Sequence, residues 1–198
     1  FVKRREEAPV QEEAPRAVVL TLMSLEQSDT LILPASVEQL EQAKRALEIE
    51  DFSQAVIAGI DYTVSCLGQL IPMDCISVED ANEMAHCLQS LKTDGEIMKY
   101  CAALEVEQPS TFTGALDIAI DIEDYELISD SEWEYGRQVL CRIGADDELI
   151  DTIDGYMDFA QLGRDSMAED GVRRTEFGLV RRLSSPFPPE PEIGQSML

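Results

Sequence analysis

The N-terminal third of the chain combines short β-branched runs with one amphipathic helix. The runs at residues 17–23 (AVVLTLM) and 30–34 (TLILP) are separated by a polar turn, so they predict a hairpin or two neighbouring strands. Ser36 and Gln39 form a capping-box pattern, which predicts that a helix begins there. The apolar residues that recur at helical spacing after this cap are Val37, Leu40, Ala43 and Leu47. A third strand is predicted at residues 55–62 (AVIAGIDY).

Helix signals dominate the middle of the chain. Ser77 caps a predicted helix at residues 77–91, and another helix is expected at about residues 94–106. Ser110 and Thr111 then precede a short helix that we expect to end at about residue 118. In the second of these helices, the residues expected to face inward are Met98, Cys101 and either Leu104 or Ala102.

The last third of the chain mixes one strand, two helices and a hairpin. Residues 124–128 (DYELI) alternate like a strand, and Ser131 caps a helix that ends before Gly144. A last helix is predicted at about residues 147–165, with one internal glycine at modest cost. Residues 172–183 are expected to form a β-hairpin or an edge strand.

This order of elements predicts the α+β class. Helices and strands alternate without a repeated βαβ period and without a glycine-rich phosphate loop. We expect two to three small modules with short mixed or antiparallel sheets and flanking helices. The predicted divisions are a flexible leader at 1–16, an N-terminal α+β module at 17–76, a central helical module at 77–109, a C-terminal acidic α+β module at 110–183 and a disordered tail at 184–198.

Composition and cysteine usage favour a folded cytoplasmic protein. With 198 residues and 44% hydrophobic content, the chain has enough apolar side chains for a core. It has neither an apolar run of about eighteen residues nor a secretory signal pattern, so we expect no membrane span and a cytoplasmic location. Its five cysteines are irregularly spaced, which indicates reduced, mostly buried thiols rather than a disulfide framework.

Candidate catalytic and metal-binding groups are few. His86 is the single histidine, and Cys87 beside it points about 100° away on a helix, so the two form no dyad by themselves. The cysteines match no zinc spacing, and residues 146–158 lack the glycine placement of a calcium loop. The sequence therefore predicts no enzyme, cofactor or metal site. A small thiol-dependent or metal-assisted hydrolase stays open if His86 meets a cysteine in a pocket.

Negative charge is concentrated in the middle of the chain. The formal net charge is -25 at pH 7, and residues 17–163 hold six Lys or Arg against thirty Asp or Glu. Eight carboxylates precede the single base of residues 115–137, namely Asp117, Asp121, Glu123, Asp124, Glu126, Asp130, Glu132 and Glu134. Four more recur at i, i+4, i+7 and i+11 of the predicted last helix, with neighbours about 5–6 Å apart along the axis. These four are Asp147, Asp151, Asp154 and Asp158.

This surplus of charge indicates a cationic partner. Self-repulsion of such size destabilises a compact state, so it exceeds what solubility requires. Double-stranded DNA carries one charge per about 1.7 Å of axis, so the surplus of 24 charges in residues 17–163 corresponds to roughly 40 Å of duplex. Such a chain could occupy a groove built for DNA. The alternative is an acidic or halophilic protein without such a partner. Direct binding of nucleic acid is disfavoured by repulsion.

Residues 156–165 (YMDFAQLGRD) combine an aromatic-x-Asp-aromatic pattern with Gly-Arg-Asp. This segment, followed by a short hairpin, resembles the C-terminal signature of the ArdA antirestriction proteins. The matching signature residues are Tyr156, Asp158, Gly163, Arg164 and Asp165. Residues 33–47, 55–62 and 124–140 are similar to that family's strand-proline-helix segment, its Ile-x-x-x-Asp-Tyr strand and its acidic strand-to-helix segment. Order and spacing agree across about residues 17–183.

The resemblance implies an elongated α+β homodimer of three small domains that mimics bent B-form DNA. Family members come from plasmids and conjugative transposons, and they inhibit type I restriction-modification enzymes by occupying the DNA-binding groove of the methyltransferase core. On this resemblance Asp124, Asp130, Glu132 and Glu134 belong to the acidic central segment. Arg164 and Asp165 are expected to be a structural pair or cap.

Two departures from the family pattern leave an alternative open. The N-terminal module is shorter than the family's, and residues 91–106 (LKTDGEIMKYCAALEV) replace a more acidic stretch. The alternative function is an acidic interaction module of a mobile genetic element that binds another basic DNA-binding protein.

Overall fold

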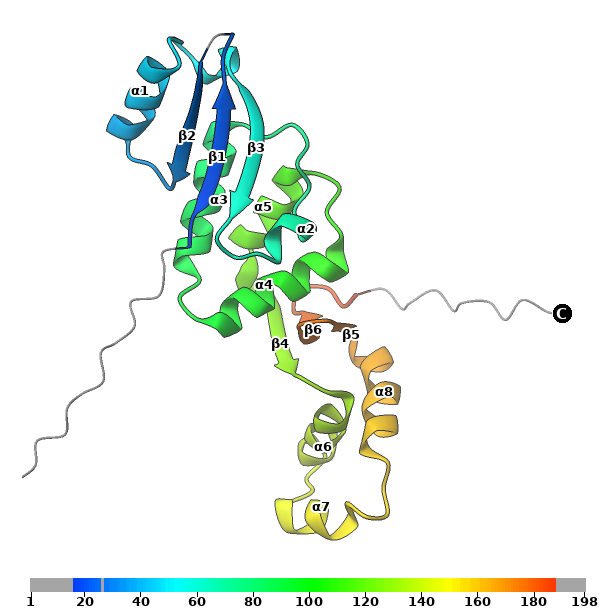
Figure 1. Cartoon of the computed structure of the whole chain (residues 1–198). Helices are drawn as coiled ribbons and strands as arrows, with labels where there is room; N and C mark the ends of the chain where they lie inside the picture. The colour runs from blue at the N-terminus through cyan, green and yellow to red at the C-terminus, as the bar shows by residue number, and fades with distance from the viewer. Residues whose placement is uncertain (1–15, 26, 188–198) are drawn as a thin grey trace, which may run out of the picture.

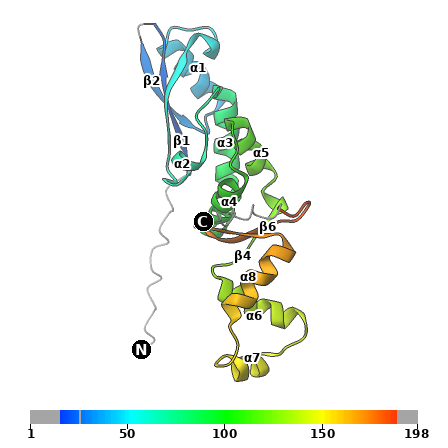
Figure 2. The same ribbon diagram turned by 90° about the vertical axis from the view of Figure 1, so that its right-hand side faces the viewer.

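The computed structural model describes residues 16–25 and 27–187. Within them the chain forms eight α-helices and two three-stranded antiparallel sheets, which confirms the predicted α+β class. The elements follow one another along a long axis, from the first sheet through a group of helices to a second sheet and a helical lobe at the far end (Figures 1 and 2). The division into modules stays a prediction.

The first sheet has the strand order β2-β1-β3. The strands are β1 (Val18–Met23), β2 (Ser28–Leu33) and β3 (Val56–Tyr62), and both pairings are antiparallel. Alternate residues of β1 are buried, with Leu20 and Leu22 fully inaccessible to solvent. The apolar alternation of the sequence thus turns one face of the sheet toward the central helices.

Helix α1 (Val37–Ala46) confirms the predicted capping box. The Ser36 side chain accepts a hydrogen bond from the Gln39 backbone N–H, and the Gln39 side chain accepts one from the Ser36 N–H at 2.8 Å. The sequence did not predict two short elements in this part of the chain. They are the 3-10 helix η1 (Phe52–Gln54) and helix α2 (Leu67–Leu70).

Three helices form the middle of the molecule. They are α3 (Val78–Ser90), α4 (Asp94–Glu107) and α5 (Phe112–Ile120), and their N-caps are Ser77, Thr93 and Thr111. In α4 the residues predicted to face inward are buried, except Met98, which is 41% exposed. That prediction was wrong for Met98 because α4 buries a continuous group from residue 100 to residue 104 instead.

The second sheet has the order β4-β6-β5. Its strands are β4 (Tyr125–Ser129), β5 (Val172–Thr175) and β6 (Gly178–Arg182), and the 3-10 helix η2 (Ile122–Asp124) precedes β4. The predicted hairpin at residues 172–183 is confirmed. Its central strand β6 also pairs with β4, so a strand more than forty residues earlier in the chain joins the hairpin.

Helices α6 (Glu132–Arg142), α7 (Asp147–Ile153) and α8 (Phe159–Asp170) form a lobe at the end of the molecule (Figure 1). We call residues 132–170 the distal lobe. Its buried residues form two small clusters, one of which also contains Val172 and Leu179 of the second sheet.

The predicted single helix at residues 147–165 was wrong. The backbone N–H groups of Tyr156 and Met157 both bond to the carbonyl of Ile153, which closes α7. Asp158 then leaves helical geometry, and its side chain accepts a hydrogen bond from Gln161 N–H to begin α8. Of the four aspartates predicted on one helical stripe, Asp147 and Asp151 therefore lie in α7, Asp154 follows its last residue and Asp158 precedes α8.

The chain beyond the second sheet packs back on the body. The Ser184 backbone N–H donates to Asp124 Oδ1 at 2.7 Å, and the Phe187 side chain is buried near Tyr125. Residues 184–187 of the predicted disordered tail thus have defined contacts. The described residues do not include residues 188–198 of that tail or residues 1–15 of the predicted leader.

Candidate partner-binding acidic surface

Two glycines set the distance between helices α6 and α8. A Cβ atom on Gly163 would lie 2.0 Å from the carbonyl oxygen of Glu132, and one on Gly136 would lie 2.0 Å from the carbonyl oxygen of Phe159. Both neighbours are backbone atoms, so neither can rotate away. The helices therefore cross in direct backbone contact, which gives the signature residue Gly163 a structural role.

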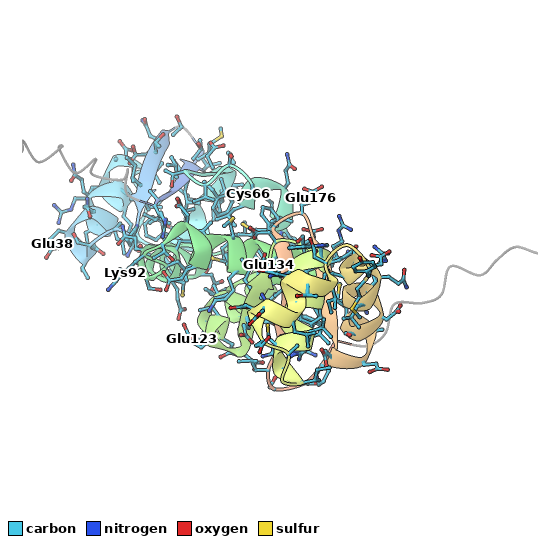
Figure 3. The ribbon with its side chains drawn as sticks, turned by 90° about the horizontal axis from the view of Figure 1, so that it is seen from below. Glu38, Cys66, Lys92, Glu123, Glu134 and Glu176 are labelled. Carbon is cyan, nitrogen blue, oxygen red and sulfur yellow. The ribbon has the colours of Figure 1, made fainter. Side chains whose placement is uncertain are left out.

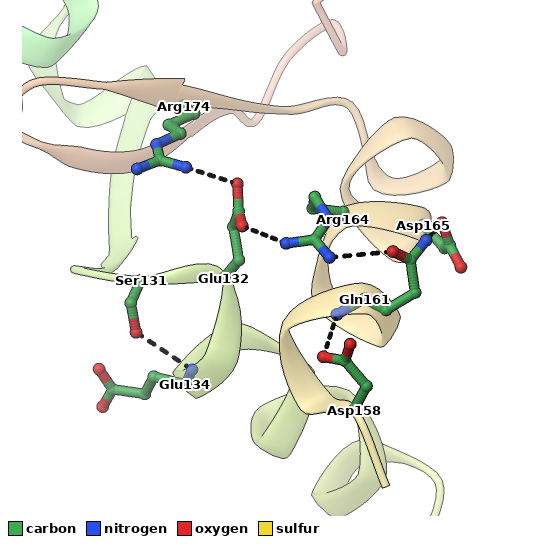
Figure 4. Close-up of polar contacts among 8 residues, drawn as sticks. All are labelled: Ser131, Glu132, Glu134, Asp158, Gln161, Arg164, Asp165 and Arg174. Carbon is green, nitrogen blue, oxygen red and sulfur yellow. Dashed lines mark hydrogen bonds and ion pairs between the residues drawn. The ribbon is translucent and has the colours of Figure 1, made fainter.

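Glu132 links three elements at the base of the distal lobe. Its carboxylate accepts a hydrogen bond from Arg164 of α8 at 2.9 Å and one from Arg174 of β5 at 2.8 Å (Figure 4). Partial burial raises the pKa of Glu132, but the hydrogen bonds and charges of the two arginines outweigh this and hold the pKa below its usual value. Glu132 was predicted as part of the partner-binding surface, but its charge is neutralised within the chain.

A second polar group joins α6 to the end of α8. Arg142 donates to Asp170 Oδ2 at 2.7 Å, and the Tyr135 hydroxyl donates to the same oxygen. Burial and the Asp170 carboxylate raise the pKa of Tyr135 to about 12, so the hydroxyl stays protonated as a donor. Burial also acts on Asp170, but bonds from Tyr135 and Arg142 lower its pKa.

The remaining signature residues surround the start of α8. Arg164 and Asp165 were expected to form a pair or cap, but they contact each other only through Gln161, which accepts from Arg164 and donates to Asp165. The residue that caps α8 is Asp158. Tyr156 is 93% exposed in the turn between α7 and α8.

Five of the twelve predicted acidic residues have defined structural contacts. Glu132 and Asp158 act as described above, and Asp124 accepts hydrogen bonds from the backbone and side chain of Ser184. Glu126 pairs with Arg181 across the second sheet at 2.6 Å, and Asp151 pairs with Arg137 at 3.1 Å. These carboxylates stabilise the fold and leave less charge for a partner.

The other predicted acidic residues face solvent. Glu123 is exposed and lies 3.9 Å from Lys99. Six more carboxylates make neither a side-chain hydrogen bond nor an ion pair with any described residue. We call these six the open acids, and they are Asp117, Asp121, Asp130, Glu134, Asp147 and Asp154. They extend from α5 across the end of β4 to the tip of the distal lobe.

Most basic side chains in the described residues are already paired with acids. Arg16, Lys44, Lys99, Arg137, Arg142, Arg164, Arg174, Arg181 and Arg182 all form such ion pairs. These pairs use only eight carboxylates, namely Glu41, Asp94, Glu107, Glu123, Glu126, Glu132, Asp151 and Asp170. Because the acids far outnumber the bases, most of the surface carboxylates in this part of the chain form no ion pair with a Lys or Arg side chain.

Sequence reasoning missed acids at the other end of the molecule. Exposed carboxylates without a cationic partner among the described residues also occur in the turn after α1, on β3 and around α3. They are Glu48, Glu50, Asp61, Asp74, Glu79 and Glu83. Figure 3 shows the acids Glu38, Glu123 and Glu134 on separate parts of the elongated chain. The sequence did contain a signal for these additional acids, because residues 46–91 contain no Lys or Arg.

Groups for other functions are not brought together in the described part of the chain. His86 is exposed and forms no hydrogen bond with a cysteine there. The described ranges hold no group of three or more metal-ligating side chains placed to bind an ion. They also hold no helix whose length and apolar character would let it cross a membrane.

Comparison with known proteins gives one family. The profile of the family described as antirestriction protein (ArdA) matches residues 26–181. The chain belongs to the ArdA antirestriction protein family. The match includes β2 and β3 of the first sheet, nearly all of the second sheet and the whole distal lobe, whereas β1 precedes it. It confirms the resemblance seen in residues 156–165. No curated protein matches the chain. In this ArdA protein, Gly163 and Arg164 hold α8 to α6, while Asp158 begins α8.

Proposed function

We propose that this ArdA protein is a non-enzymatic DNA mimic. In this proposal it binds the DNA-binding groove of a type I restriction-modification methyltransferase core and thereby blocks the enzyme. Membership of an antirestriction family supports the biological role. The mechanism rests on one observation: in the described residues most bases are paired with acids, whereas most of the exposed carboxylates along the chain are not.

The physical argument concerns what a basic groove recognises. A groove that binds DNA gains most of its affinity from phosphate charges at regular spacing, largely independent of sequence. The scaffold is elongated (Figures 1 and 2). With exposed carboxylates from one end to the other, it presents a similar field. Hydrogen bonds within the fold hold Glu126 and Glu132, so these two residues support the shape of this field rather than its strength.

Binding is proposed to require no single acid and to involve a homodimer. Surface charges contribute roughly 0.2–1 kcal/mol each, so replacing four open acids by amides lowers affinity for the core roughly 10- to 100-fold. The test variant carries Asp117→Asn, Asp121→Asn, Asp130→Asn and Glu134→Gln. A matched control exchanges Asp and Glu at the same positions, which keeps every charge.

The measurement is equilibrium binding of each variant to a purified type I methyltransferase core at several salt concentrations. The proposal predicts weaker binding and a shallower salt dependence for the amide variant, with the charge-preserving control close to the parent protein. Equal affinity of all three proteins would contradict mimicry through these acids. If the core binds none of them while another basic DNA-binding protein does, the interaction-module alternative is correct. Sedimentation of the free protein tests the dimer.

A further inference from the structure

Two cysteines from distant parts of the chain meet inside the body of the molecule. Cys66 precedes α2 and Cys101 lies in α4, and their sulfur atoms are 3.1 Å apart. Both thiols are reduced in this structure. A disulfide bond has a length of about 2.05 Å, so the two sulfurs need to approach by about 1 Å to form one.

The two thiols differ in their access to solvent. Cys101 is fully buried, whereas Cys66 is partly exposed. Burial and the contact with Cys66 raise the pKa of the Cys101 thiol, so this thiol stays protonated. A small oxidant therefore reaches Cys66 first, and the buried neighbour is already in place to react with the product.

We propose that Cys66 and Cys101 form a redox-sensitive site that closes to a disulfide when the protein meets hydrogen peroxide. In the first step, Cys66 Sγ attacks the peroxide, the O–O bond breaks, and a sulfenic acid forms with release of water. In the second step, Cys101 Sγ attacks Cys66 Sγ. The S–O bond breaks, and the departing hydroxide takes the Cys101 proton as a second water. Two thiols lose two electrons, and the peroxide gains them.

The disulfide would stabilise the connection between the first sheet and the second sheet. It joins the segment after β3 to α4, and α4 carries Glu105 and Glu107, which hold the hairpin of the second sheet. Glu105 accepts from the backbone N–H of Glu176, and Glu107 pairs with Arg182 at 2.6 Å. A disulfide carries no charge, so closing the bond adds no charge to the surface. The site is therefore independent of the proposed mimicry.

A variant with Cys75, Cys87 and Cys141 replaced by serine isolates the pair for the test. The folded variant is treated with hydrogen peroxide, and peptide mapping locates any crosslink. Thermal melting is recorded with and without a reductant. We expect a Cys66–Cys101 link, a mass lower by two hydrogen atoms, and a melting temperature higher by roughly 5–15 °C that the reductant reverses.

The control adds Cys66→Ser, and it is expected to lose both the crosslink and the shift. Peptide mapping of the parent protein after the same treatment gives a second reading that needs no substitution. The proposal is overturned if both thiols keep reacting with an alkylating reagent. It is equally overturned if Cys66 ends as a sulfinic acid beside reduced Cys101, or if melting is unchanged after the crosslink forms.

Discussion

Replacing Gly163 by alanine is expected to separate the two main helices of the distal lobe. The new Cβ would lie 2.0 Å from the Glu132 carbonyl oxygen and 3.2 Å from the Gly136 nitrogen, whereas ordinary contacts begin near 3.4 Å. The helices must therefore move apart by about 1 Å or more. Such overpacking costs typically 1–3 kcal/mol and sometimes more, and alanine returns up to about 1 kcal/mol through its higher helix propensity.

Because both close neighbours are backbone atoms, we expect a cost at the upper end of this range, which leaves a net loss of about 2 kcal/mol of the free energy of unfolding of the lobe. For a urea dependence near 2 kcal/mol/M, this loss lowers the unfolding midpoint by about 1 M. Trp133 is the only tryptophan of the chain, and its ring packs edge-on against Phe159 of α8 at 5.8 Å. Its fluorescence therefore reports on the contact between the two helices.

The matched control is Gly155→Ala in the turn after α7. No atom lies within 4 Å of a Cβ at Gly155, so the free energy of unfolding of this variant is expected to stay within about 0.5 kcal/mol of that of the parent protein. A Gly163→Ala protein with the parent midpoint and an unchanged Trp133 signal would refute the argument from helix contact.

Further predictions concern the polar contacts and the open acids. Glu132→Gln should destabilise the lobe by about 1 kcal/mol in urea unfolding followed by Trp133 fluorescence, whereas Glu134→Gln removes the same charge from an exposed position and should change little. The folded-state pKa values of Glu132 and Asp170 are lowered, so their contribution is complete above about pH 4 and is lost as pH falls through the folded values. At pH values below about 4, the urea midpoint of the lobe should therefore decrease, and it should decrease less in Glu132→Gln. An equal decrease in both proteins would rule out the Glu132 carboxylate as a source of this pH dependence. Charge reversal at Asp130 or Asp154 should weaken binding to the methyltransferase core less than tenfold each in titrations, and complete loss from either change would indicate a specific contact instead of a shared field.

Local signals in the sequence predicted most of the elements. Ser36, Ser77, Thr111 and Ser131 each cap the helix they were expected to begin, because a cap depends on residues only two or three positions away. The strands at residues 17–34 and the hairpin at 172–183 were likewise readable from alternation and turn residues. The break between α7 and α8 was missed because Gly155 alone was taken as tolerable inside a helix. In the structure a second helix begins after this break, and Asp158 is its N-cap.

Contacts between distant residues were not accessible in this way. The pairing of β4 with β6 joins Glu126 to Arg181, and no local pattern fixes that register. The close approach of α6 and α8 depends on Gly136 and Gly163 facing each other, which requires both helix axes to be known. For the same reason, the prediction from sequence treated all twelve acids as equivalent. Only the fold separates Glu132, which is held by two arginines, from the open acids.

Competition with DNA tests the central proposal most directly. A labelled duplex is bound to a purified type I methyltransferase core, and this ArdA protein is added in increasing amounts at two salt concentrations. Mimicry predicts that the protein displaces the duplex at a fixed stoichiometry, and that its own binding to the core weakens at the higher salt. Duplex that stays bound at every ratio, with the added protein folded, would contradict the proposal that it occupies the DNA-binding groove.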